Sequence, residues 1–180
     1  MSASARSRRA WGWHPLTDEW AARIVADAAV RPGELVVDIG AGHGALTAEL
    51  VERGARVIAV ELHPARARHL RGRFAGRSVT VVQADALSIR LPGHPFRVVA
   101  SPPYAIASPL LRLLLAPSSR LTAADLVLQR AVVRRYVNGE AAGPGRWRRQ
   151  WRLQAGRPLP RRAFRPSPRV DSAVLVMRRR

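Results

Sequence analysis

A hydroxyl side chain, two prolines and an aromatic ring follow one another in the stretch ASPPY at residues 100–104. The apolar run FRVVA, which leads into them, predicts a buried strand. Proline has no N–H and a fixed φ, so it cannot continue a central strand. The stretch therefore predicts a stiff, extended exit from a sheet that holds carbonyl groups and the ring in fixed directions. An ordinary strand-to-helix turn is the alternative that the stretch alone leaves open.

Glycines and acids follow two earlier apolar runs. The segment DIGAGHG at 38–44 has glycines at alternate positions, which allows a tight turn and a close ligand approach. Glu61 ends the next run roughly 20 residues after Gly40, where an acid in this kind of sheet binds both ribose hydroxyls. The spacing differs from the G-x-G-x-x-G of dinucleotide sites, and Asp38 would repel a phosphate. A cationic ribose-bearing ligand suits this pattern, and S-adenosylmethionine is one.

A third acid completes the predicted cofactor site. Asp85 follows the next apolar run, where its side chain could accept a hydrogen bond from the exocyclic amine of adenine. The backbone N–H of Ala86 would supply a matching donor. A turn or helix-cap role is the alternative for Asp85.

The elements that must position these residues alternate along the chain. Strands are expected at 34–40, 55–62, 78–85, 96–100, 123–129, 150–156 and 170–179. Helices are expected at 16–30, 63–74 and 106–116. A further helix is expected after the glycine turn in 41–54, and another begins at Arg130 and stops at Asn138-Gly139. Such alternation predicts a Rossmann-like α/β fold, with a mostly parallel seven-stranded sheet and helices on both faces. The last two strands are expected to form a hairpin at one edge.

The charge of the chain is strongly positive and uneven. All 31 basic residues are arginines, against 12 acidic residues, for a net charge of +19. A GC-rich coding bias would explain the choice of arginine but not the excess of positive charge. Residues 141–180 hold twelve arginines and one acid, whereas residues 34–100 hold nine arginines and six acids. Arginine binds phosphate through its planar fork, so we expect a nucleic-acid partner, with ribosomal RNA the leading candidate.

Other features exclude several classes of protein. There are no cysteines, hence no disulfide framework, no thiolate nucleophile and no cysteine-based zinc site. The five histidines have no metal-like set of neighbours, so no metal is expected. No apolar run is long enough for a membrane helix, and the basic start of the chain is not a signal peptide, so we expect a cytoplasmic protein.

Taken together, these motifs resemble the Erm family of ribosomal RNA adenine-N6 methyltransferases, which confer macrolide–lincosamide–streptogramin resistance. The resemblance runs from about Gly12 to the C-terminus and includes LVLQR at 126–130 and RRAFRPSPRVDSAVLVMRR at 161–179. It is strongest to the short, arginine-rich actinobacterial and mycobacterial members. It implies a class I S-adenosylmethionine-dependent methyltransferase domain over residues 11–180, after a flexible basic arm at 1–10. A monomer without the family's helical C-terminal domain is expected.

The resemblance also implies roles for single residues. The Ser101 side chain and the Pro102 carbonyl would accept the two hydrogens of an adenine N6 amine in large-subunit ribosomal RNA. Tyr104 would stack on the extruded base, and Phe164 would close over its other face, unless Phe164 is a hydrophobic anchor for its loop. The implied cofactor-binding residues are His14, Leu16, Gly40, Gly42, Glu61, Asp85, Ala86 and Ser101.

Two departures from the family pattern stand out. The family usually has asparagine where this chain has Ser101, whose shorter side chain is expected to reach N6 only after a backbone shift or through water. The family's N-terminal Gly-Gln-Asn-Phe-Leu appears here as GWHPL at 12–16, so His14 and Leu16 are carried over by position.

Arginines near the C-terminus are expected to anchor the RNA. They are Arg146, Arg148, Arg149, Arg152, Arg161 and Arg162. Trp147 and Trp151 could stack on bases, although tryptophans at this spacing are more often packing residues. Alternative functions remain open at this point: methylation of small-subunit ribosomal RNA or of DNA, or a non-catalytic RNA-binding assembly factor on the same fold.

Overall fold

The computed structural model describes residues 14–140 and 147–180 of the chain. Its strands are β1 (Leu35–Ile39), β2 (Arg56–Glu61), β3 (Val79–Gln83), β4 (Phe96–Ala100), β5 (Leu121–Gln129), β6 (Trp151–Leu159) and β7 (Ser172–Arg179). Its α-helices are α2 (Asp18–Ala28), α3 (Ala45–Glu52), α4 (Pro64–Arg73), α5 (Ala107–Leu114), α6 (Arg130–Val137) and α7 (Trp147–Gln150). Two short 3₁₀ helices are η1 (Tyr104–Ile106) and η2 (Arg161–Ala163). The predicted arm at 1–10 lies outside the described residues.

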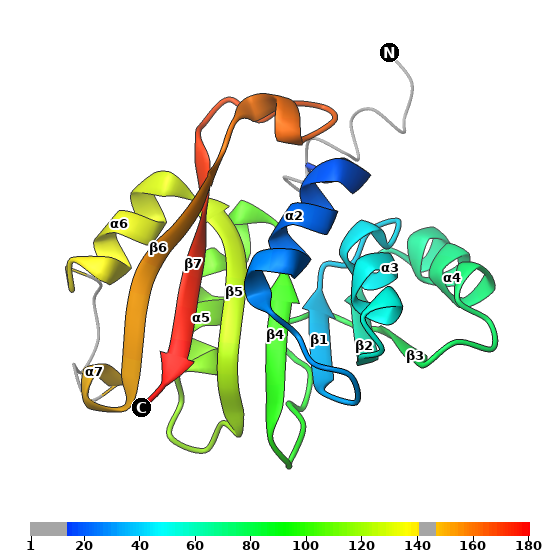
Figure 1. The fold of residues 1–180 in the computed structure, drawn as a ribbon, viewed down its shortest axis with the longest axis horizontal. Helices are drawn as coiled ribbons and strands as arrows, with labels where there is room; N and C mark the ends of the chain where they lie inside the picture. The colour runs from blue at the N-terminus through cyan, green and yellow to red at the C-terminus, as the bar shows by residue number, and fades with distance from the viewer. Residues whose placement is uncertain (1–13, 141–146) are drawn as a thin grey trace.

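The strands form one seven-stranded sheet in the order β3-β2-β1-β4-β5-β7-β6 (Figure 1). The first five strands in that order are parallel. Strand β7 pairs antiparallel with β5, and β6 pairs antiparallel with β7 at the edge. The expected mostly parallel sheet with a closing hairpin is therefore confirmed. Among the described residues, no helix is long and apolar enough to cross a membrane.

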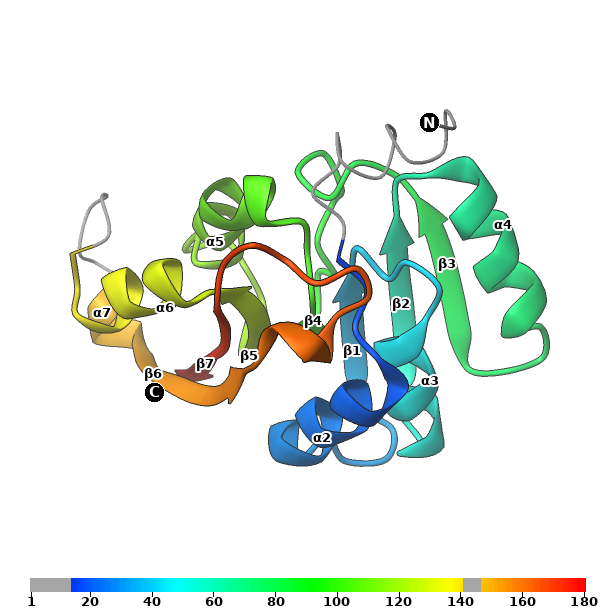
Figure 2. The ribbon, with the colours of Figure 1, turned by 90° about the horizontal axis from the view of Figure 1, so that it is seen from above.

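Helices cover both faces of the sheet because successive strand residues face opposite sides. In β1, Val36 belongs to the core cluster beneath α2 and α3, whereas Val37 belongs to the cluster beneath α5. Figure 2 shows α2 and α3 on one side of the strands and α5 and α6 on the other. Leu70 and Phe74 share a cluster with Ala59 of β2 and with Val79 and Val81 of β3, which places α4 over β2 and β3.

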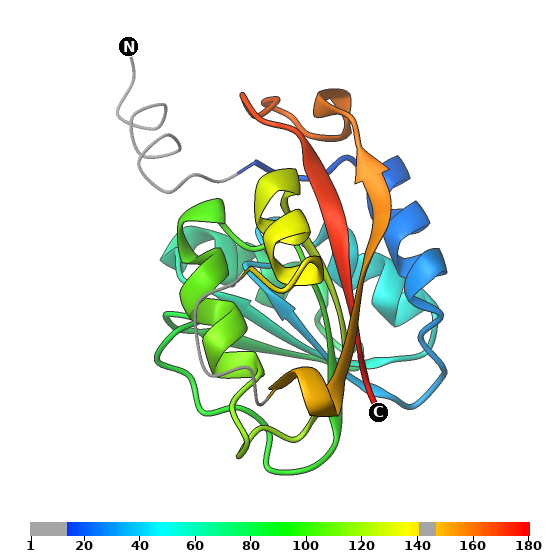
Figure 3. The ribbon, with the colours of Figure 1, turned by 90° about the vertical axis from the view of Figure 1, so that its left-hand side faces the viewer.

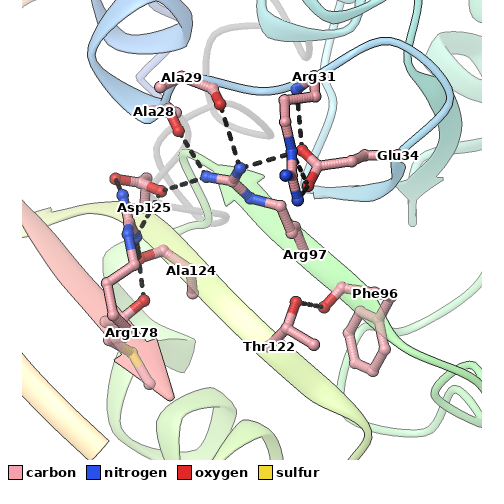
Figure 4. A network of polar contacts seen from close by, with 11 residues as sticks. Ala28, Ala29, Arg31, Glu34, Phe96, Arg97, Thr122, Ala124, Asp125 and Arg178 are labelled. Atoms are coloured by element: carbon pink, nitrogen blue, oxygen red, sulfur yellow. Dashed lines mark hydrogen bonds and ion pairs between the residues drawn. The ribbon is translucent and has the colours of Figure 1, made fainter. Parts of the chain in front are cut away.

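An ionic network ties three strands to the end of α2 (Figure 4). Asp125 of β5 accepts two hydrogen bonds of 2.9 Å from Arg178 of β7 and lies 3.6 Å from Arg97 of β4. Arg97 also donates hydrogen bonds to the carbonyls of Ala28 and Ala29, the last residues of α2 and its cap. A 3.0 Å ion pair joins it to Glu34, just before β1. The network fixes the helix against the sheet at the side away from the strand ends that carry the predicted site.

Two segments far apart in sequence meet above those strand ends. The backbone N–H of Thr17 donates to Ala163, and that of Arg165 donates to Pro15. Leu16 and Phe164 form an isolated β-bridge between these contacts. The segment that leads into α2 is therefore held against the loop between β6 and β7, which crosses the top of the hairpin in Figure 3.

Candidate cofactor and substrate site

The glycine turn after β1 and the diproline corner after β4 lie in direct contact. Gly40 has a φ of +75°, and a Cβ built on it would lie 3.2 Å from Pro103 and 3.4 Å from Pro102. Parallel pairing of β1 with β4 brings their carboxyl ends to the same edge, which explains the contact. The corner therefore faces the glycine-lined pocket, as the predicted chemistry requires.

Two cavities, one on each side of Gly40, share this corner. We call one the aspartate cavity, because Asp38 lines it, and the other the glutamate cavity, because Glu61 lines it. Their volumes are about 210 and 220 Å3. All of the predicted cofactor residues line one or both cavities. The aspartate cavity is lined by His14, Leu16, Gly40, Gly42 and Ser101. The glutamate cavity is lined by Gly40, Glu61, Asp85 and Ala86.

Glu61 is buried at the end of β2, where its carboxylate organises both cavities. One carboxylate oxygen accepts the N–H of Gly42 at 2.9 Å. The other accepts the N–H of His63 and a hydrogen bond from Arg66, both at 2.8 Å. Since Gly42 lies in the glycine turn, Glu61 holds that turn in place while lining the glutamate cavity.

Asp38 is the second buried acid of the site, only 1% exposed. The Thr47 hydroxyl of α3 donates to it at 2.7 Å. Burial raises the pKa of Asp38 to about 7. The negative charge of the nearby Glu61 also raises this pKa, whereas hydrogen bonding to Thr47 lowers it. A cationic ligand in the aspartate cavity would favour the ionised form of this group.

Tyr104 is held from two sides. Its hydroxyl shares a 2.5 Å hydrogen bond with the Ser172 hydroxyl at the start of β7. The His14 ring stacks on the Tyr104 ring, with centroids 5.9 Å apart and planes at 29°. His14 Nδ1 in turn donates a 3.0 Å hydrogen bond to the carbonyl of Pro166. Burial raises the pKa of Tyr104, so the ring remains a neutral platform. The structure thus fixes the aromatic group that follows the diproline corner.

Comparison with known proteins identifies the family to which this chain belongs. The model of a family described as ribosomal RNA adenine dimethylase matches residues 5–180. The chain belongs to the ribosomal RNA adenine dimethylase family. Over 97% of its length it is 36% identical to an rRNA adenine N-6-methyltransferase of Saccharopolyspora erythraea, and over 96% it is 37% identical to ribosomal RNA small subunit methyltransferase A of Bordetella avium. The resemblance inferred from the motifs is confirmed.

A solved member of the group matches the fold closely. The crystal structure of the 23S rRNA methyltransferase ErmE superposes with a TM-score of 0.81 at 33% identity, over 92% of this chain and 69% of that one. The chain spans about half of the Saccharopolyspora relative, at 47%, and 69% of the Bordetella relative. These matches confirm the Rossmann-like methyltransferase fold.

The residues present fit the cofactor that this family and fold imply. An acid at the end of β2 suits a ribose, and the buried Asp38 suits an ammonium group. Two apolar side chains that the sequence analysis did not single out add to the glutamate cavity: Leu62 is 39% exposed and Leu87 is 36% exposed, and both line it. Large exposed leucines at the rim of this mostly apolar cavity suit the flat faces of an adenine ring. The signal available in the sequence was a leucine directly after the strand-ending acid.

Asp85 has two contacts that bear on its predicted role. Its carboxylate accepts the N–H of Leu87 at 2.9 Å, and its carbonyl accepts the N–H of Ser88 at 2.9 Å. Both hydrogen bonds are typical of a turn residue, which is the alternative role that the sequence analysis gave for Asp85. The side chain nevertheless lines the glutamate cavity beside Ala86, where an adenine amine could reach it.

The structure places Phe164 in the core rather than over the candidate base site. Its side chain is 1% exposed and belongs to the core cluster that includes Leu16 and Trp20. The β-bridge between Leu16 and Phe164 holds the loop between β6 and β7 against the segment before α2, so the Phe164 ring points into the core. The hydrophobic-anchor interpretation is the one that the structure supports.

The arginines predicted to bind RNA separate into two groups. Arg161 and Arg162 lie on η2, above the strand ends that carry the site, and Arg161 lies 3.5 Å from Asp171. The others lie at the opposite end of the sheet: Arg148 and Arg149 on α7 and Arg152 at the start of β6 (Figure 1). Arg146 lies outside the described residues. The arginines expected to anchor RNA therefore lie at both ends of the sheet, and their role in RNA binding stays a prediction.

Proposed function

We propose that this protein transfers a methyl group from S-adenosylmethionine to the N6 amine of an adenine in large-subunit (23S) ribosomal RNA. Acting as a cytoplasmic monomer, it would confer resistance to macrolide, lincosamide and streptogramin B antibiotics. The observation that carries the proposal is the contact between the diproline corner and Gly40, which joins an amine-binding corner to a cofactor pocket. The similarity to ErmE, which is named a 23S rRNA methyltransferase, supports the choice of subunit.

The corner residues act on the amine by positioning. The nitrogen lone pair of an adenine amine is delocalised into the ring, so the nitrogen is a poor nucleophile while its hydrogens stay in the ring plane. The Ser101 side chain and the Pro102 carbonyl accept these hydrogens and hold them out of that plane. No described residue hydrogen-bonds the Ser101 hydroxyl, and Ser101 lines the aspartate cavity. S-adenosylmethionine supplies the electrophilic methyl group, and rate acceleration comes from alignment and electrostatics.

Tyr104 receives the base after it leaves the RNA stack. Extruding a base costs a few kcal/mol, and stacking on an aromatic ring offsets about 1–3 kcal/mol of that cost. The hydrogen bond to Ser172 fixes the ring orientation before the substrate arrives. Less conformational freedom is then lost on binding.

Methylation of small-subunit ribosomal RNA is the second candidate. The 37% identity to ribosomal RNA small subunit methyltransferase A of Bordetella avium favours it. The corner and the cofactor cavities serve both reactions equally, since each modifies an adenine amine. The RNA substrate alone distinguishes the two.

Transfer of tritiated methyl groups to the two ribosomal RNAs, with the modified base mapped by primer extension, tests the proposal. We expect label on an adenine of large-subunit RNA. The Ser101→Ala variant should lose roughly a hundredfold in turnover while it still binds S-adenosylmethionine. Label on small-subunit RNA alone would support the second candidate. Absence of label on either RNA, with cofactor binding intact, would reject RNA methylation.

A further inference from the structure

Arg73, in the last turn of α4, lines the aspartate cavity. The end of α4 packs tightly on the glycine turn, because a Cβ at Gly44 would lie only 2.7 Å from the Phe74 ring. Arg73 donates a hydrogen bond from Nη1 to the carbonyl of His43 in that turn. A residue roughly 30 positions after the glycine turn is thereby brought to the cofactor side of the site.

The Arg73 guanidinium has N–H groups that no described residue accepts. In the part of the chain that the structure describes, the bond to His43 is its one hydrogen bond, and no carboxylate lies within ion-pair distance. Its Cζ lies 5.2 Å from the centroid of the Phe74 ring. Arginine presents five N–H donors in a fork that matches a carboxylate. Nε and Nη2 therefore remain for a ligand in the cavity.

The aspartate cavity thus carries charges of both signs. The acids Asp18 and Asp38 and the base Arg73 line it together. The methionine portion of S-adenosylmethionine is a zwitterion, with an ammonium and a carboxylate on the same carbon. We propose that Arg73 binds that carboxylate, while the buried Asp38 attracts the ammonium. This inference rests on the cofactor assigned under the proposed function.

A purely structural role makes a different prediction. If Arg73 served only to brace the glycine turn through His43, its loss would disturb every ligand of the two cavities alike. If it binds the carboxylate, its loss must affect only ligands that carry a carboxylate. Two ligands that differ in this group alone separate the possibilities.

The experiment is calorimetric binding of S-adenosylhomocysteine and of its decarboxylated amine to the wild-type protein and to Arg73→Gln. We expect Arg73→Gln to weaken S-adenosylhomocysteine binding roughly tenfold and to leave binding of the decarboxylated amine unchanged. Arg73→Lys should recover part of the loss, since it keeps the charge. Arg71→Gln is the matched control, because Arg71 is exposed on the same helix and is not among the residues that line the cavity.

The outcomes separate this inference from the function on which it rests. Equal losses for both ligands, or no loss for either, in Arg73→Gln would overturn the carboxylate role while leaving cofactor use intact. Failure of the wild-type protein to bind either ligand would instead reject the cofactor assignment. A loss confined to S-adenosylhomocysteine supports the role.

Discussion

Asp38 combines burial, hydrogen bonding to Thr47 and a position beside the glycine turn. Burial raises its pKa to about 7, so the group exchanges a proton near neutral pH in the free protein. A ligand with an ammonium group binds the ionised form better, so binding must release protons. Asp38 is therefore placed to make cofactor affinity depend on pH near neutrality.

We predict that S-adenosylmethionine binding at pH 7 releases about half a proton, and that affinity rises as the pH is raised from 6 to 8. Calorimetric titration in two buffers of different ionisation enthalpy measures the released protons directly. Asp38→Asn should bind more weakly and lose both effects. The folded-state pKa lies above the ordinary value of 3.8, so this group also lowers stability as pH rises from about 4 to 7. An unchanged proton release in Asp38→Asn would show that another group titrates.

Strands β4, β5 and β7 are joined by the charges around Asp125, and this network sets how firmly the antiparallel hairpin is attached (Figure 4). Asp125 is 2% exposed, so its charge depends on Arg97 and Arg178 for compensation. Removing one partner of a buried ion pair leaves an uncompensated charge, which costs more than the pair contributes.

Arg178→Gln, which leaves the buried Asp125 carboxylate with Arg97 alone at 3.6 Å, should therefore lower the free energy of unfolding by about 3 kcal/mol, measured by urea denaturation. The surface pair between Asp27 and Arg157 is the matched control, since their side chains are 43% and 38% exposed. Asp27→Asn should cost less than about 1 kcal/mol, because solvent screens an exposed pair. Equal effects of the two substitutions would refute a special role for the buried network.

Positive charge is distributed over both ends of the molecule. Arg161 and Arg162 lie near the site, whereas Arg148, Arg149 and Arg152 lie at the other end of β6. That strand has nine residues, which corresponds to roughly 26 Å between its ends. We propose that the distal arginines contact RNA phosphates well away from the modified base, so that only a substrate of sufficient length would reach them.

Replacing Arg148, Arg149 and Arg152 by glutamine should weaken binding of a long ribosomal RNA fragment and make its salt dependence shallower by about two to three charges. Turnover on a short hairpin around the target adenine should stay unchanged. Replacement of Arg161 and Arg162 should weaken binding of both substrates. Filter-binding titrations over a range of salt concentrations measure this, and an equal loss on both RNAs in the distal variant would contradict the proposal.

The sequence predicted the strand-end residues that line the two cavities, but not Leu62, Leu87 or Arg73. Glu61 ends a strand, Gly40 and Asp85 each follow one, and the carboxyl ends of parallel strands meet at one edge of a sheet. Short apolar runs indicated those strands, so local sequence was enough to bring the side chains together. The seven-stranded sheet and its closing hairpin followed from the same patterns.

The positions of Phe164 and of the arginines depend on contacts between segments that are distant in sequence. Phe164 is buried because the loop after β6 pairs with Leu16, a contact across more than a hundred residues that no local pattern signals. Arg152 lies far from the site because β6 and β7 run antiparallel, which sends the start of β6 to the opposite end of the sheet. Local periodicity fixes which residues end a strand, but the direction and pairing of each strand depend on the packing of the whole core, and these set where the charges lie.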